Sequence, residues 1–443
     1  MKSFLFVLLL SACVFSASAQ ERVTADDVKR EFLHSWNAYK QYAWGHDALR
    51  PLSKQPHDWH NVSLYMTPVD AYDTMLLMGL KDEAAEAKQL ILGNLSFDQN
   101  IEVQAFEIII RLLGGLLSAY QMDGDPRFLA LAKDLGDRLM PIYDSPTGIP
   151  FRYVHLQTGA IRDSVNNPAE IGTALLEYGT LSKLTGNPEY YDKAKQALVQ
   201  VFNRRSKLGL VGTWVNVVTG KWTNTSSHVS GAIDSYYEYL LKAWKLFGDQ
   251  DCKLMYDASI AAVNKHVADT VRGELWYGRV EMETGKRTST RFGSLEAFFP
   301  AVLAMGGDLE RARLLQESCY KMWTLHGIEP EGIDYATMTA TSKGYVLRPE
   351  IIESAYYLYH YTGDEKYKRM GETFFRDLVR YCKTDAGYAE LEDVTTKQKR
   401  DAMESFFLAE TLKYLYLLFA PKDTLPFENV IFNTEAHPIR KTW

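Results

Sequence analysis

The sequence predicts an all-α fold: an (α/α)7 barrel in which seven helical hairpins close into a ring, joined by short β-hairpin loops. The first observation behind this is a recurrent Gly-Asp or Gly-Asn signal that separates an apolar helical pattern from a more amphipathic one. Glycine favours the end of one helix, and Asp or Asn favours the start of the next. The signal returns about every 60 residues, at Gly124, Gly186, Gly248, Gly306 and Gly363.

The second observation is an acid near the start of each apolar helix. In a closed ring the inner helices are covered on both sides, which explains why stretches such as "FEIIIRLLGGLLSAY" are almost continuously apolar. The opening stretch "FLHSWNAYKQYAWG" supplies an outer partner. Acids at equivalent positions are then expected to converge at one end of the barrel. The seven acids are Asp70, Glu107, Glu170, Asp234, Glu296, Glu350 and Glu404.

Strand signals are few and short. The stretches "GIPFRYVHLQTGAIR", "GKWTNTS" and "ELWYGRV" predict β-hairpin loops between helices. After the last apolar helix, "IFNTEAHPIRK" predicts a strap that runs back through the barrel and presents Thr434 at its core. In this interpretation His437 and Pro438 fix the strap, and His437 is not a metal ligand.

Composition and the N-terminus bound the class of protein. The 443 residues are 46% hydrophobic and carry a net charge of −7 without a basic stripe, which excludes nucleic acid as a partner. "MKSFLFVLLLSACVFSASAQ" reads as a bacterial-type signal peptide cleaved after Ala19. The expected mature chain, residues 20–443, is one exported catalytic domain, periplasmic or secreted, a monomer without a membrane span. A lipoprotein anchored through Cys13 is the alternative. The three remaining cysteines allow at most one disulfide, and no zinc motif is present.

Several acids have a partner on the same helix face. Residues three or four positions apart on a helix are neighbours, and buried acids are costly unless they are paired or functional. One interpretation is helix capping and buried ion pairs. The other is a pocket for a polyhydroxylated ligand, a hard cation, or both. The pairs are Glu107 with Arg111, Asp234 with Glu238, Glu350 with Glu353, and Phe406 with Glu410.

Seven motifs, in order from about residue 28 to 439, together resemble glycoside hydrolase family 47. These are the inverting, calcium-dependent α-1,2-mannosidases of N-glycan processing, and the resemblance implies the same seven-hairpin barrel. The motifs are "YAWGHDALRPLS", "VDAYDTMLLMGL", "FEIIIRLLGGLLSAY", "IDSYYEYLLKAW", "LRPEIIESAYYLY", "MESFFLAETLKYLYLLF" and "FNTEAHP".

The resemblance implies a role for each matching residue. Glu107 matches the general acid, thought to act through a water, and Asp234 matches a second carboxylate that some accounts prefer as proton donor. Glu350 matches the base that activates water. Thr434 matches the residue that binds Ca²⁺ through its carbonyl and hydroxyl oxygens. Sugar- or metal-shell positions are matched by Arg111, Glu170, Arg348, Glu353, Phe406, Glu410 and Glu435.

The function implied is an exo-acting, inverting α-1,2-mannosidase that removes terminal mannose from mannose-rich glycans. Two departures from the family put substrate fit in question: Ala297 stands where many members have the disulfide partner of Cys319, and Gly293-Ser294 replaces Asp-His. One alternative is a catalytically weak, mannose-binding relative. A weaker alternative is another helical toroid, such as a sugar epimerase, but these usually have six hairpins and would not explain "NTEAHP".

Overall fold

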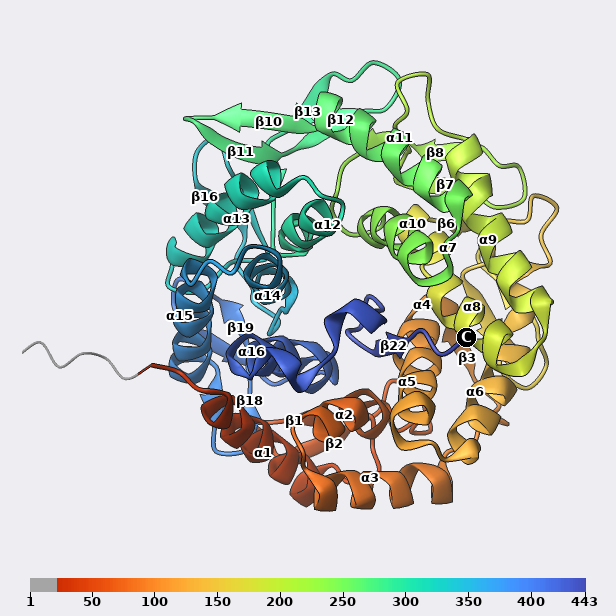
Figure 1. Cartoon of the computed structure of the whole chain (residues 1–443), viewed down its shortest axis with the longest axis vertical. Helices are drawn as coiled ribbons and strands as arrows, with labels where there is room; N and C mark the ends of the chain where they lie inside the picture. The colour runs from red at the N-terminus through yellow and green to blue at the C-terminus, as the bar shows by residue number, and fades with distance from the viewer. Residues whose placement is uncertain (1–21) are drawn as a thin grey trace, which may run out of the picture.

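In the computed structural model, which describes residues 22–443, seven helical hairpins follow one another around a closed ring (Figure 1). The first outer helix, α1, packs against the last inner helix, α16, and this contact between the first and last barrel helices closes the circle. The predicted signal peptide, its cleavage site and Cys13 lie outside the described residues. The predicted (α/α)7 barrel is confirmed.

Each hairpin has one helix on the inside and one on the outside of the ring. The inner elements are α2 Met66–Leu77; α4 Ala105–Ile108, η1 Ile109–Leu113 and α5 Gly114–Asp123; α7 Pro168–Gly172 and α8 Leu175–Thr185; α10 Asp234–Phe247; η3 Leu295–Phe298 and α12 Phe299–Met305; α14 Glu350–Thr362; and η4 Phe407–Thr411 and α16 Leu412–Phe419. The outer helices are α1 Ala25–Tyr42, α3 Lys81–Asn94, α6 Pro126–Leu139, α9 Pro188–Asn203, α11 Gln250–His266, α13 Leu309–Thr324 and α15 Lys366–Tyr381.

The Gly-Asp and Gly-Asn signals act as expected at the hairpin turns. Gly124 takes a left-handed conformation, φ 85°, as it ends α5, and the carboxylate of Asp125 accepts from the backbone N–H of Arg127 to start α6. Asn187 caps α9 in the same way. An N-cap side chain of this kind stabilises a helix by about 1 kcal/mol. The turns therefore define where each inner helix stops and its outer partner begins.

One inner helix has the length and composition of a membrane span. The continuous helical stretch Ala105–Asp123 is long and apolar enough to cross a membrane by length and composition, whereas the mature chain was expected to have no membrane span. It is 72% buried inside the ring. The core of a protein selects the same composition as a bilayer, so the barrel interior accounts for this helix.

The strands form small antiparallel sheets beside the helical turns, as the loop motifs predicted. Four of these sheets have two strands: β1 Ala48–Arg50 with β2 Gln55–His57, β10 Ala268–Val271 with β11 Glu274–Tyr277, β17 Lys383–Thr384 with β18 Gly387–Tyr388, and β19 Glu390–Asp393 with β20 Gln398–Arg400. The three-stranded sheets are β3 Glu102–Gln104, β4 Tyr153–His155 and β5 Ile161–Arg162; β6 Val165–Asn166, β7 Trp214–Asn216 and β8 Trp222–Asn224; β9 Ser226–Ser227, β12 Arg279–Glu281 and β13 Arg287–Ser289; and β14 Arg291–Phe292, β15 Gly332–Asp334 and β16 Thr339–Ser342.

The C-terminal strap is a β-hairpin inside the ring, formed by β21 Val430–Phe432 and β22 Pro438–Arg440 (Figure 1). Its turn fits against α5 because two glycines leave room. A Cβ at Gly114 would lie 2.5 Å from Asn433 Nδ2, and one at Gly115 would lie 3.2 Å from the ring of His437. The glycine pair in "RLLGGLLSAY" therefore allows the hairpin to reach the centre of the barrel.

A buried charge cluster anchors this hairpin to the inner helices. Lys413 Nζ lies 2.7 Å from Asp73 Oδ1 and donates to the carbonyl oxygen of Ala436. The two ring nitrogens of His437 face Asp73 Oδ2 at 2.7 Å and Asp70 Oδ1 at 3.3 Å. All of these side chains are at most 1% exposed. The imidazole thus holds the strap in place.

The remaining cysteines are free thiols within residues 22–443. Cys252, Cys319 and Cys382 are all buried. Burial raises the pKa of each thiol, since a thiolate is poorly solvated in the core. The ring is therefore held by packing and polar contacts over the described residues, without a disulfide.

Candidate active site

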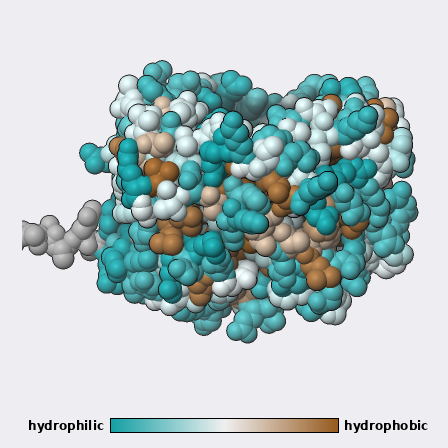
Figure 2. Space-filling view, turned by 90° about the horizontal axis from the view of Figure 1, so that it is seen from above, coloured by the Kyte–Doolittle hydropathy of each residue, from teal (hydrophilic) through white to brown (hydrophobic). Residues whose placement is uncertain are grey.

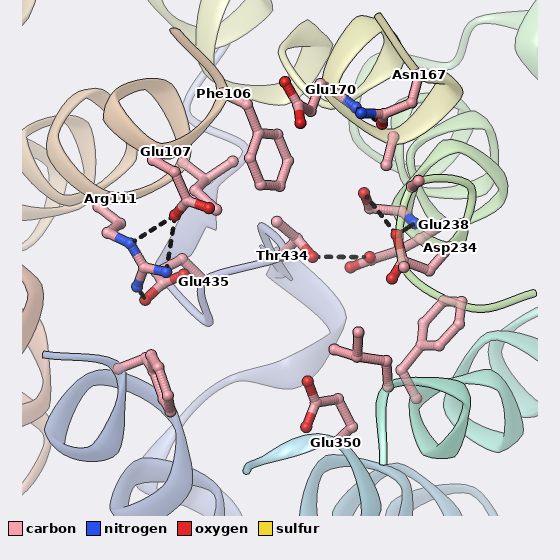
Figure 3. A pocket seen from close by; sticks show the side chains of 18 of the residues that line it. Phe106, Glu107, Arg111, Asn167, Glu170, Asp234, Glu238, Glu350, Thr434 and Glu435 are labelled. Atoms are coloured by element: carbon pink, nitrogen blue, oxygen red, sulfur yellow. Dashed lines mark hydrogen bonds and ion pairs between the residues drawn. The ribbon is translucent and has the colours of Figure 1, made fainter. Parts of the chain in front are cut away.

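A cavity of about 500 Å³ opens at one end of the barrel, and every residue to which the family resemblance gives a role lines it. Figure 3 shows Glu107, Arg111 and Glu435 on one side, Asp234 and Glu238 on another, and Glu350 on a third. Thr434 lies between them on the turn of the C-terminal hairpin (Figure 3). Segments more than 300 residues apart in the chain therefore build one site.

On the first wall, Glu107 is held by Arg111 one helical turn later. Arg111 Nε donates to Glu107 Oε2 at 3.0 Å, and Nη1 bonds to Glu435. The guanidinium lies between two aromatic rings, 5.6 Å from the centre of Phe406 and 5.4 Å from that of Trp59. The side chain of Glu107 keeps 27% of its surface exposed. This carboxylate is fixed in direction yet open to a ligand.

On the second wall, Asp234 begins α10 and accepts from the backbone N–H of Ser235 at 2.8 Å. Burial, aided by the charges of Glu238 and Glu296, raises the pKa of Asp234 to about 7. Glu238, one turn along, pairs with buried Lys242 and accepts from the hydroxyl of Thr434 at 3.1 Å. Asp234 is therefore a carboxyl group able to hold a proton near neutral pH.

On the third wall, Glu350 starts α14 with its side chain 14% exposed. Burial raises its pKa to about 7, while Arg348, with Nη1 3.9 Å away, opposes the shift. Arg348 itself is held by Glu331 at 3.0 Å. Glu350 Oε2 has no hydrogen-bond partner within residues 22–443. A buried carboxylate with an uncommitted oxygen suits a base that accepts a proton from water.

Carboxylates crowd the floor around Thr434. Burial raises the pKa of Glu353 and of Glu435 to about 8, and that of Glu410 well above its usual range. Like charges on neighbouring carboxylates add to this, since the nearby cations Arg111 and Lys242 offset them only in part. A buried group of carboxyl side chains with too few cations to balance their ionised forms fits a bound cation, whose charge would favour ionisation.

Direct ligation by several carboxylates does not fit, however. No group of three or more His, Cys, Asp or Glu side chains in the described part of the chain is arranged to hold a metal. A hard cation here would use the hydroxyl and carbonyl oxygens of Thr434 and reach the surrounding carboxylates through water. The oxygen-only donor set is one that Ca²⁺ accepts.

A sequence profile described as "Glycosyl hydrolase family 47" matches residues 31–441. The chain belongs to glycosyl hydrolase family 47. Among curated relatives, human "Mannosyl-oligosaccharide 1,2-alpha-mannosidase IB" is 36% identical over 94% of this chain and 70% of its own length. "ER degradation-enhancing alpha-mannosidase-like protein 2" of Mus musculus is also 36% identical, over 93% of this chain and 77% of its own. The solved "alpha-1,2-mannosidase from Trichoderma reesei" superposes with a TM-score of 0.87 at 30% identity, covering 95% of this chain and all of that one.

As a member of family 47, the chain is a glycoside hydrolase. The backbone around its active site departs from regular helix geometry. Two inner helices contain π-helical turns, Ile109–Leu113 and Phe407–Thr411, which carry Arg111 and Glu410 into the cavity. Such turns are frequent at functional sites. Three left-handed residues also border the site: Ala232 with φ 76°, Leu347 with φ 62° and Ala436 with φ 57°. Each of these residues lies within three positions of a site carboxylate, Asp234, Glu350 or Glu435, and strained backbone of this kind clusters at functional sites.

Three of the seven acids expected at the mouth of this family 47 barrel do not line the cavity. Asp70 lies under the strap and accepts from Ser405 and from His437. Glu404 precedes its helix and accepts from Trp59 Nε1 at 3.1 Å, and Glu296 is buried outside the lining of the cavity. Similar sequence position does not fix the height of a residue along an inner helix, and the seven inner helices differ in length and regularity.

The sequence analysis also missed residues that support the site. Arg152, in a β-hairpin loop, binds Glu170 through two hydrogen bonds of 2.8 Å. Glu331 supports Arg348 in the same manner. The partners are 18 and 17 positions apart, so no helical periodicity joins them. Each of Arg152 and Glu331 directly precedes a short strand, and a charged residue at the entry to a strand is the signal that could have suggested them.

Proposed function

We propose that the chain is an exo-acting, inverting α-1,2-mannosidase that removes terminal α-1,2-linked mannose from mannose-rich glycans and depends on Ca²⁺. The observation that carries this is the set of carboxylates around one cavity, with Glu350 facing Glu107 and Asp234 across the space (Figure 3). An inverting glycosidase needs an acid on the leaving-group side and a base that holds water on the opposite face of the sugar.

The chain's own residues supply both functions. Glu350 accepts a proton from the attacking water, and its free oxygen and raised pKa support that role. The leaving oxygen takes a proton from the acid side, where Glu107 acts through a water or Asp234 acts directly. The aromatic face of Phe406 and the cations Arg111 and Arg348 orient the sugar around this line.

Thr434 would hold the calcium ion, with Glu238, Glu353, Glu410 and Glu435 around it. A bound Ca²⁺ supplies attraction for sugar hydroxyls and for the nucleophilic water. Thr434 and Glu435 also form the floor of the cavity, because the C-terminal hairpin occupies the middle of the ring. A pocket with a floor accepts the end of a glycan chain, which supports exo action.

The test is hydrolysis of the methyl α-glycoside of α-1,2-mannobiose with Ca²⁺, followed by NMR from the first minutes, because the only free mannose formed from this substrate is the sugar cleaved from its non-reducing end. We expect β-mannose to appear before mutarotation, since water attacks from the face opposite the leaving group. Early α-mannose would exclude inversion. Binding of mannobiose without turnover would favour instead a weak, mannose-binding relative, although Glu107, Asp234 and Glu350 are all present.

We also propose export to the periplasm or the medium as a monomer, with the lipoprotein form through Cys13 as the alternative. Figure 2 shows one face of the molecule on which hydrophilic side chains predominate and hydrophobic ones are interspersed. Within residues 22–443, the exposed large hydrophobic residues are Trp44, Leu52, Val218, Leu254, Leu314, Tyr361 and Trp443. Light scattering and N-terminal sequencing of the mature protein test these two points.

A further inference from the structure

A second cavity, of about 360 Å³, adjoins the first on the Glu107 side, and Gln104 and Glu107 line both. We propose that it is a separate sugar subsite that binds a further mannose residue of a branched glycan, on the leaving-group side of the scissile bond. The proposal rests on the proposed function and extends it from the reaction to the size of the substrate. The cavity volume lies within the about 300–1,000 Å³ typical of small-molecule sites.

The wall of this cavity has the chemistry of a carbohydrate site. Trp59 and Tyr153 present aromatic rings, and His57, His60 and Gln104 present hydrogen-bonding groups. Gln104 and Tyr153 are directly opposed on β3 and β4, so their side chains share one face of that sheet. Aromatic surface beside a few convergent polar groups suits a ligand with apolar faces and a rim of hydroxyls.

Charge at this second cavity favours a neutral ligand. No Lys or Arg side chain is among its lining residues. Its two acids are already compensated, Glu102 by Arg162 at 2.9 Å and Glu107 by Arg111 at 2.9 Å. Burial lowers the pKa of His60, which keeps that imidazole neutral. An anion or a cation would therefore find little net electrostatic attraction in this cavity, whereas a sugar hydroxyl can form a hydrogen bond with each of these groups.

His60 has a free hydrogen-bonding nitrogen for such a ligand, and Trp59 is held in a fixed position beside it. His60 Nδ1 is buried and has no hydrogen-bond partner within residues 22–443. Trp59 is fixed at three points: its Nε1 donates to Glu404 at 3.1 Å, its backbone N–H donates to Asp47 at 3.1 Å, and Arg111 lies over its ring. A rigid wall binds with less loss of conformational entropy than a mobile one.

The second cavity lies beside Glu107, which is the side of the scissile bond where the leaving sugars are expected. An acid must lie beside the oxygen of the leaving group, so the sugars that leave extend away from the Glu107 side. A disaccharide ends within the first cavity, whereas a larger branched glycan continues toward Tyr153 and His57. The second cavity should therefore affect large substrates and leave small ones almost unchanged.

The test compares kcat/KM for α-1,2-mannobiose and for a purified nine-mannose glycan, using Tyr153→Ala, His57→Ala and a matched control. His155→Ala is the control, because His155 lies two residues along the same strand and lines neither cavity. We expect Tyr153→Ala and His57→Ala to lower kcat/KM about tenfold on the glycan and less than about twofold on mannobiose, as the loss of one binding contact predicts. The control should change neither value.

Equal losses on both substrates would overturn the proposal, and an accompanying shift of the pH profile would show that the cavity serves proton supply to Glu107. No loss on either substrate would also overturn it. If the wild type hydrolyses neither substrate, the proposed function fails, and the subsite is tested by calorimetric titration of the nine-mannose glycan. In that case, equal affinity of the wild type and Tyr153→Ala overturns the subsite alone.

Discussion

Replacement of Lys413 by methionine tests how the C-terminal hairpin is held in the barrel. Lys413 joins Asp73 on α2 to the carbonyl of Ala436 in the hairpin, each at 2.7 Å, with its side chain wholly buried. Loss of one partner of a buried ion pair costs about 3–5 kcal/mol, because the other charge stays in a poorly polarisable interior. Asp73 keeps His437 as a partner at 2.7 Å. We therefore expect Lys413→Met to lower the free energy of unfolding by about 3 kcal/mol, at the lower end of that range.

Urea unfolding of the wild type and the variant measures this difference. Lys366→Met is the control, because its ion pair with Glu317 is exposed and should contribute at most about 1 kcal/mol. Burial alone would lower the pKa of His437, but Asp73 and Asp70 raise it to about 9. The stability from this imidazole is thus complete below its ordinary value of 6.5 and is lost as the pH rises through about 9. A Lys413→Met loss no larger than the control would show that packing alone holds the hairpin.

Three further predictions concern catalysis. Glu350→Gln and Glu107→Gln should each lower kcat on mannobiose by at least about 10²-fold with an unchanged circular dichroism spectrum, since general acid–base groups contribute about 10²–10⁴; near wild-type turnover in both would show that the assignment is wrong. Thr434→Ala should weaken Ca²⁺ binding in calorimetric titration of chelated protein while the barrel stays folded, and an affinity equal to wild type would leave the hairpin without a metal role. Activity should fall below about pH 7 as Glu350 gains a proton and above about pH 7 as Asp234 loses one. An alkaline limb that survives in Asp234→Asn would assign the proton donor to Glu107 instead.

The ring and the identity of the site residues follow from sequence because both rest on local signals. Gly124 with Asp125, and Gly186 with Asn187, mark turns by chemistry that acts within a few residues. Glu107 and Arg111 are neighbours wherever the stretch is helical. The predicted Ca²⁺-binding role of Thr434 comes from the motifs that resemble family 47, because no periodic pattern in the sequence indicates it.

The remaining features depend on contacts between distant segments, so a single sequence does not contain them. The cluster of Lys413, Asp73 and His437 joins residues up to 364 positions apart. The role of Trp59, between Glu404 and Arg111, depends on a loop whose course is set by tertiary hydrogen bonds to Asp47. The π-helical turns and the left-handed backbone at Ala232 are likewise consequences of packing rather than of local propensity.

The floor of the active site comes from a segment that closes on residues 324 positions earlier, at the contact of Arg111 with Glu435. Contacts between such distant segments form slowly, because the entropy of closing a long loop opposes them. During refolding, individual helical hairpins can regain their circular dichroism signal while the centre of the ring is still open to solvent. Hydrolytic activity should therefore return later than helicity, so that turnover reports completion of the whole ring rather than the formation of its parts.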